Sequence, residues 1–77
     1  MASVIPFEAL RENQRYYEEF DHGSACIPCS VIRRLDAEHV QMFYGEEQTW
    51  AQMTKKNAQF RYWNDVPTDD ERKVYTW

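Results

Sequence analysis

The chain has only two glycines and three prolines among its 77 residues. These two residue types shape most tight turns, and a multi-stranded antiparallel meander normally needs several of them. Their scarcity therefore favours helices over strands. We expect one small domain, residues 1–77, that is mainly α and consists of three to four short helices.

The clearest helical pattern lies in residues 6–20, PFEALRENQRYYEEF. Pro6 suits the first position of a helix, where its missing N–H costs no hydrogen bond. Apolar side chains then recur close to one face at helical spacing, at Phe7, Leu10, Tyr17 and Phe20. The pattern predicts a helix over residues 6–20.

Residues 30–63 allow two interpretations. Asp36 can cap a helix over residues 37–44, and Thr49 with Gln52 has the spacing of a capping box. Yet HVQMFY also alternates as a strand does, and it can form a hairpin with the residues before it. Residues 49–63 can likewise form two strands joined by a turn at TKKN. The alternative fold is therefore α+β, with an N-terminal helix followed by a small antiparallel sheet.

A second capping box follows Pro67 near the end of the chain. Thr68 precedes Glu71 by three positions, and the acids of DDERKVYTW fall at the positive end of a helix. This pattern predicts a short C-terminal helix.

The charge balance limits the class of partner. Nine Lys and Arg face thirteen Asp and Glu, which gives a net charge of −4. Binding to nucleic-acid phosphates or to an anionic membrane normally needs a basic surface, so we expect neither. The one basic and aromatic stretch is KKNAQFRYW, residues 55–63, and single-stranded nucleic acid is the alternative partner that it suggests.

The expected location in the cell rests on two kinds of segment that the sequence lacks. No stretch is long and apolar enough to span a bilayer, and the first ten residues, MASVIPFEAL, do not resemble a secretory signal. We expect a cytoplasmic protein, in which thiols stay reduced.

Both cysteines and both histidines lie within residues 21–39. Zinc prefers four thiolate or imidazole ligands, and His22, Cys26, Cys29 and His39 supply that number. The spacing H-x3-C-x2-C-x9-H matches no standard zinc finger, and a redox C-x-x-C normally accompanies a βαβ unit that 77 residues cannot hold. We expect two ordinary cysteines and no cofactor, with a zinc site as the alternative.

No catalytic motif such as a P-loop, a nucleophile elbow or HExxH occurs. Twelve residues are aromatic, and Tyr and Trp are common at interfaces. We therefore expect a non-enzymatic inhibitor or regulator that docks an acidic, aromatic-rich surface on a larger protein, as some viral host-takeover proteins do.

The residues expected to contact the partner lie in the C-terminal third: Arg61, Tyr62, Trp63, Tyr75 and Trp77. Trp, Tyr and Arg are the residue types that most often dominate binding energy. A chain of this length also gains stability from self-association, so a homodimer is a further expectation. The alternative function is a small zinc module that binds nucleic acid or protein.

Overall fold

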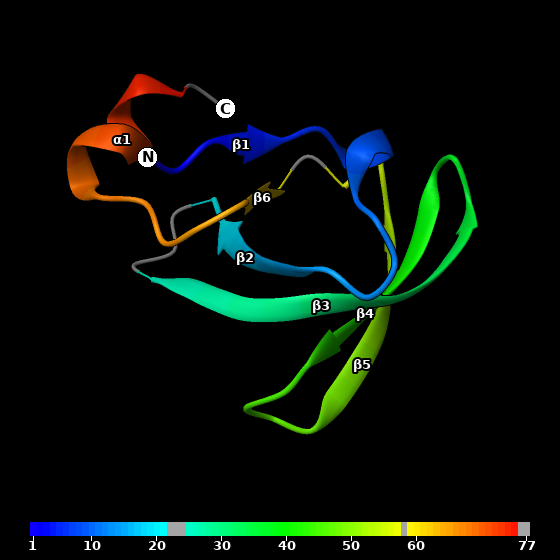
Figure 1. Cartoon of the computed structure of the whole chain (residues 1–77). Coiled ribbons are helices and arrows are strands. Elements are labelled where there is room, and N and C mark those ends of the chain that lie inside the picture. The colour runs from blue at the N-terminus through cyan, green and yellow to red at the C-terminus, as the bar shows by residue number, and fades with distance from the viewer. Residues whose placement is uncertain (22–24, 58, 76–77) are drawn as a thin grey trace.

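The computed structural model describes residues 1–21, 25–57 and 59–75, and the six strands among them form one antiparallel sheet (Figure 1). Its strands are β1 (Val4–Ile5), β2 (Arg15–Phe20), β3 (Cys26–Asp36), β4 (His39–Tyr44), β5 (Thr49–Thr54) and β6 (Phe60–Trp63). The short helices are η1, a 3₁₀ turn (Phe7–Ala9), and α1 (Asp69–Val74).

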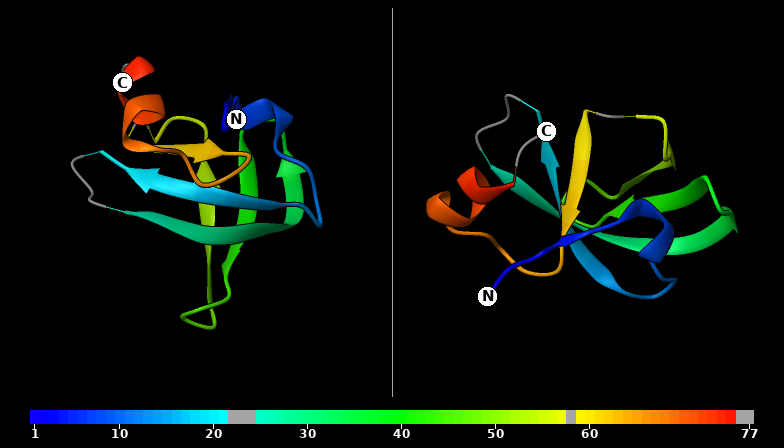
Figure 2. Two further views of the ribbon diagram at one scale, coloured as in Figure 1. Left: turned by 60° about the vertical axis from the view of Figure 1, so that its left-hand side comes forward. Right: turned by 90° about the horizontal axis from the view of Figure 1, so that it is seen from above.

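The strand order is β1-β6-β2-β3-β4-β5. Strands β2 to β5 form a meander, and the chain then returns so that β6 pairs with β2. Strand β1 pairs with the other side of β6. The sheet is strongly curved, and α1 lies on the same side of the molecule as β1 (Figures 1 and 2).

The prediction of a mainly α fold is wrong, and so is the helix over residues 6–20 that both alternatives shared. This segment begins with η1 and ends as β2. Strand β2 lies between β3 and β6 and is covered in part on both faces, so Glu18 and Glu19 are both buried. A strand that is buried on both faces does not show the alternation of apolar and polar residues that identifies most strands. Aromatic residues such as those of β2 are nevertheless common in strands.

The helix expected from Asp36 and the helix expected from Thr49 are also absent, because both segments are strands in the structure. The hairpin interpretation is correct for β3 and β4, and the two-strand interpretation is correct for β5 and β6. The C-terminal capping box is confirmed: Thr68 accepts from the N–H of Glu71, and the Glu71 carboxylate accepts from the N–H of Thr68.

The turns show why scarce glycine did not prevent a meander. Asn13 and Gln48 occupy the left-handed region, with φ of 64° and 54°. Asn is one of the non-glycine residues that enter this region most readily. The Gln48 side chain also closes its turn by donating to the carbonyl oxygen of Gly45 at 2.6 Å. In addition, β3 changes register with β4 twice, which bends one long strand without a turn.

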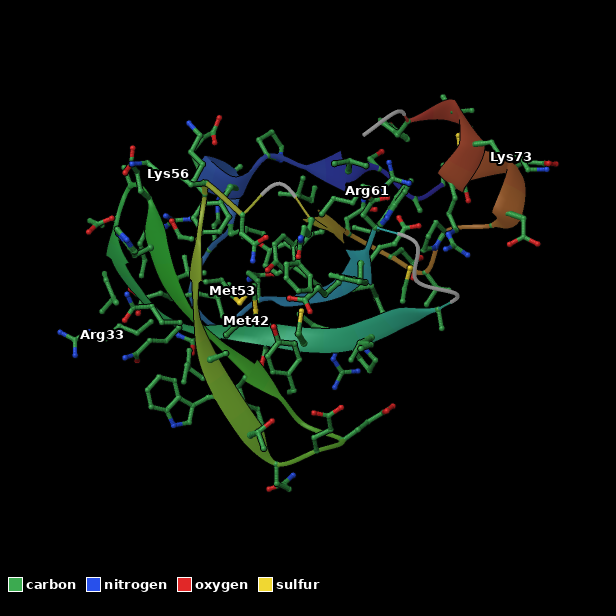
Figure 3. All side chains as sticks on the ribbon, turned by 180° about the vertical axis from the view of Figure 1, so that it is seen from behind. Arg33, Met42, Met53, Lys56, Arg61 and Lys73 are labelled. Atoms are coloured by element: carbon green, nitrogen blue, oxygen red, sulfur yellow. The ribbon has the colours of Figure 1, made fainter. Side chains whose placement is uncertain are left out.

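The core fills the concave side of the curved sheet. Its buried residues are Leu10, Tyr16, Cys29, Val31, Val40, Met42, Met53 and Tyr62. Figure 3 shows Met42 and Met53 pointing into this space from β4 and β5. Trp63 is fully buried on the opposite face of β6, where Tyr75 packs edge-on against it at 5.1 Å.

Of the helices in the described parts of the chain, none has the length and apolar character needed to cross a membrane.

Candidate functional site

The convex side of β3, β4 and β5 forms a surface that we call the outer face. Val40, Met42 and Met53 point into the core, so the residues that alternate with them point outward. The outer face comprises Ile32, Arg33, Gln41, Phe43, Trp50 and Gln52. Cross-strand pairing places Phe43 beside Trp50, Gln41 beside Gln52, and Arg33 beside Gln41.

Apolar side chains at the outer face are open to solvent. Trp50 is 60% exposed and Ile32 is 44% exposed. Ile32 lies where β3 shifts register against β4, and a bulge of this kind re-aims a side chain. Tryptophan has the largest side chain of all residue types. The fold thus leaves Trp50 uncovered, although its core contains few large aliphatic residues.

A depression adjoins the outer face on the side of β2. The Phe43 row continues through Ser30 on β3 to Arg15 on β2, each residue directly opposite the next. The depression has a volume of about 370 Å³ and is lined by Arg15, Pro28, Cys29, Ser30, Phe43, Gly45 and Glu46. The aromatic edge of Phe43 therefore borders a recess that an incoming side chain can enter.

Acidic turns frame the outer face at both ends of β4. Asp36 ends β3 and Glu38 lies in the β3–β4 turn that follows, and Glu46 and Glu47 lie in the β4–β5 turn. A hydrogen bond with His39 at 2.9 Å, together with one from the N–H of Glu38, lowers the pKa of Asp36. Asp36 is therefore ionised at neutral pH. Lys55 and Lys56 lie at this same end, where the N–H of Lys55 donates to the carbonyl oxygen of Glu38 at 2.9 Å, so the β4–β5 turn is the more acidic end of the frame.

The structure describes four of the five expected contact residues, and none of these four lies on the outer face. Tyr62 lies in the core and Trp63 beneath the C-terminal segment. The Arg61 side chain is mostly covered, whereas Tyr75 is exposed. Trp77 lies outside the described residues. Since Tyr62 and Trp63 are inside the fold, Tyr75 is the described member of the set that a partner can reach most directly.

Arg61 and Trp63 instead belong to an ionic cluster centred on Glu19, which points away from the concave core. One Glu19 oxygen accepts from Arg61 Nε at 2.6 Å and from Trp63 Nε1 at 2.8 Å. The other accepts from Arg72 Nε of α1 at 2.7 Å. Burial alone would raise the pKa of Glu19, but these three hydrogen bonds outweigh it and lower the pKa.

Tyr62 belongs to a second polar cluster, inside the core. Tyr44 and Tyr62 donate their hydroxyls to the same oxygen of Glu18, at 2.6 and 2.9 Å. Burial raises the pKa of Glu18, and the two hydrogen bonds oppose this shift without cancelling it. Burial also raises the pKa of the neighbouring Cys29 thiol to about 12, so Cys29 is an unreactive thiol at neutral pH.

The proposed zinc ligands are not brought together among the described residues. Cys26 and Cys29 are three positions apart in β3, so their side chains point to opposite faces of the strand. Cys26 faces Glu19 and Cys29 faces Tyr16 in the register with β2. His39 lies at the far end of β3 beside Asp36, and His22 lies outside the described residues.

Trp50 was not among the residues expected to contact a partner. The signal that identifies it is the alternation within TWAQMT, where Trp50 and Gln52 share one face and Ala51 and Met53 the other. Three comparisons with known proteins give no further guidance: no family model, no curated protein and no solved structure matches this chain.

Proposed function

We propose that the protein is a non-enzymatic inhibitor or regulator that docks its outer face on a larger protein. The observation that supports this most is the 60% exposure of Trp50 beside Phe43, on the same face of the sheet as the exposed Ile32. Trp is one of the residue types most often found to dominate binding energy. Trp63 provides a contrast, because this second tryptophan is fully buried within the fold.

The charges define the partner's chemistry. The matching surface carries an apolar side chain for Trp50 and Phe43, and Lys or Arg residues opposite the turns of Asp36–Glu38 and Glu46–Glu47. Complementary charge at the rim speeds association and excludes wrong partners, while the aromatic centre holds the complex. Gln41 and Gln52 supply side-chain amides that can donate or accept hydrogen bonds between these regions.

The test compares two single variants. Trp50→Ala removes the exposed ring of the outer face, and Phe20→Ala is the matched control, since Phe20 is 44% exposed and lies on β2 away from this face. Proteins captured from the native lysate by both the wild type and Phe20→Ala are then purified.

Affinities are measured with the purified partner. We expect Trp50→Ala to weaken binding by about 2 kcal/mol or more, roughly thirtyfold, with the melting temperature unchanged. Equal affinity of Trp50→Ala and the wild type would show that the partner does not use the outer face.

A further inference from the structure

Strand β5 is an open edge of the sheet. In the described chain it pairs with β4 and lies at the end of the strand order. Its six residues, TWAQMT, include no charge, proline or glycine, which are the usual means of blocking an edge. Figure 2 shows that the turn between β4 and β5 projects beyond the rest of the sheet, which leaves this edge accessible.

Opposite charges lie at the two ends of this edge. Glu46 and Glu47 come shortly before β5, and Lys55 and Lys56 directly follow it. All four residues are exposed. An antiparallel neighbour with the same sequence would place its lysines beside these glutamates and its glutamates beside these lysines.

We propose that β5 pairs with β5 of a second copy of this chain, antiparallel and across a twofold axis at Ala51. In this register Thr49 pairs with Met53 of the second copy and Trp50 with Gln52, so the turn that carries Glu46 and Glu47 comes next to Lys55 and Lys56 of the second copy. Both ends are matched at once, because a twofold interface repeats every contact. A parallel arrangement would instead bring like charges together at both ends.

The register also preserves the faces of the sheet. Trp50 comes opposite Gln52 of the second copy, so the two outer faces become continuous and both Trp50 rings lie on the same side. Lys55 contacts Glu8 of its own chain at 3.5 Å, but both side chains are more than half exposed. An exposed ion pair of this kind is weak enough to be exchanged for a new one.

Association stops at two copies. The opposite edge of the sheet is β1, which has two residues and offers no comparable strand. When β5 pairs with β5 of the second copy, neither chain has a long edge strand left unpaired. The assembly therefore ends at the dimer and does not grow into a fibre. A single pair of strands is a small interface, and we expect a dissociation constant in the micromolar range.

The experiment reverses the charge at each end separately. E46K/E47K gives a chain with basic residues at both ends of β5, and K55E/K56E gives one with acidic residues at both ends. Sedimentation equilibrium of the wild type is expected to show dimers. Each double variant alone is expected to dissociate at least about tenfold more readily, because like charges then face each other.

Mixing the two double variants in equal amounts restores all four attractive contacts, so heterodimers of wild-type affinity are expected. The quadruple variant E46K/E47K/K55E/K56E is also expected to form homodimers. It provides a second test of the charge pairing if one of the double variants fails to fold. A wild type that stays monomeric overturns the proposal, and so do dimers that neither double variant weakens or a mixture that does not associate.

The inference does not rest on the proposed function, since self-association is measured without any partner. K55E/K56E leaves Trp50 and the acidic turns in place, so it separates the two. Weaker dimerisation of K55E/K56E with retained partner binding agrees with both ideas, whereas dimers that the charge reversals do not weaken overturn the dimer alone. If Trp50→Ala binds the partner as tightly as the wild type, only the proposed function fails.

Discussion

Glu18 and Glu19 are neighbours on β2, both buried, and they occupy opposite environments. Glu18 points into the core and accepts from two tyrosine hydroxyls. Glu19 points to the other face and accepts from two arginines and a tryptophan. The pKa of Glu18 is raised and that of Glu19 is lowered. Burial acts to raise the pKa of both carboxylates. The tyrosine hydroxyls around Glu18 oppose this shift only in part, whereas the arginine and indole donors around Glu19 outweigh it.

The two carboxylates also have different structural roles. Glu18 joins β2 to β4 and β6 within the core, through Tyr44 and Tyr62. Glu19 joins the sheet to α1, and Arg61 extends this link by donating to the carbonyl oxygens of Arg72 and Tyr75, at 3.1 and 2.8 Å. This ionic cluster thus helps to hold the C-terminal segment over Trp63, together with the hydrogen bond that the N–H of Ala2 donates to the Glu71 carboxylate at 2.8 Å.

The largest effect is expected for Glu19→Ala. Removing the carboxylate takes away the buried anion that the guanidinium groups of Arg61 and Arg72 share, and the acceptor of the indole N–H of Trp63. We expect a loss of about 3–5 kcal/mol in the free energy of unfolding, measured by urea denaturation. Asp69→Ala is the control, since Asp69 is 92% exposed and contacts Arg72 at 3.8 Å. A loss no larger than the control's would show that the cluster is not a structural link.

A smaller loss is expected for Arg61→Lys, which keeps the charge but not the planar fork. Arg61 contacts Glu19 and two carbonyl oxygens at once, and lysine cannot reproduce that geometry. We expect a cost of about 1–3 kcal/mol and faster exchange of the amide hydrogens in α1. An unchanged exchange rate in α1 would contradict the role of Arg61 in holding the C-terminal segment.

Tyr62→Phe is expected to cost about 1 kcal/mol, the usual net value of one hydrogen bond. The Glu18 oxygen keeps its shorter contact with Tyr44, so the carboxylate is not left without a donor. Urea denaturation at neutral pH measures the loss. A cost as large as that of Glu19→Ala would show that the core cluster is as essential as the ionic one.

Local signals in the sequence were sufficient where a structure depends on neighbouring residues alone. The Thr68–Glu71 capping box is such a case, and it forms as predicted. The similar spacing of Thr49 and Gln52 does not yield a helix, because pairing of β5 with β4 buries Met53 and outweighs the local preference. Distant pairing of this kind has no signature within a short window of sequence.

The candidate site was missed for the same reason. Arg61, Tyr62 and Trp63 have the composition of a binding surface, yet β6 is an internal strand, and both of its faces are covered. Trp50 has no such covering because β5 is an edge. Which aromatic residues remain exposed thus depends on strand order, and strand order was not readable from composition or periodicity.

The smallest effect at neutral pH, and the most diagnostic one, is expected for Glu18→Gln. The amide keeps an oxygen that accepts from Tyr44 and Tyr62, so stability at pH 7 is expected to change by less than about 1 kcal/mol. The pH dependence is what distinguishes the variant. The raised pKa of Glu18 means that the folded chain holds this proton at pH values where the unfolded chain, with a pKa near 4.5, has lost it. This contribution to stability is full below about pH 4.5 and is lost as the pH rises through the folded pKa.

Glu19 acts in the opposite sense, because its contribution is present above about pH 4.5 and is lost as the pH falls through its lowered pKa. Unfolding free energies of the wild type and Glu18→Gln, measured by urea from pH 4 to pH 8, separate the two groups. Relative to the wild type, Glu18→Gln is expected to lose stability progressively as the pH is lowered through the folded pKa of Glu18. Parallel curves for the two proteins would show that Glu18 does not titrate differently in the folded and unfolded chains, and that the contrast between the two carboxylates is wrong.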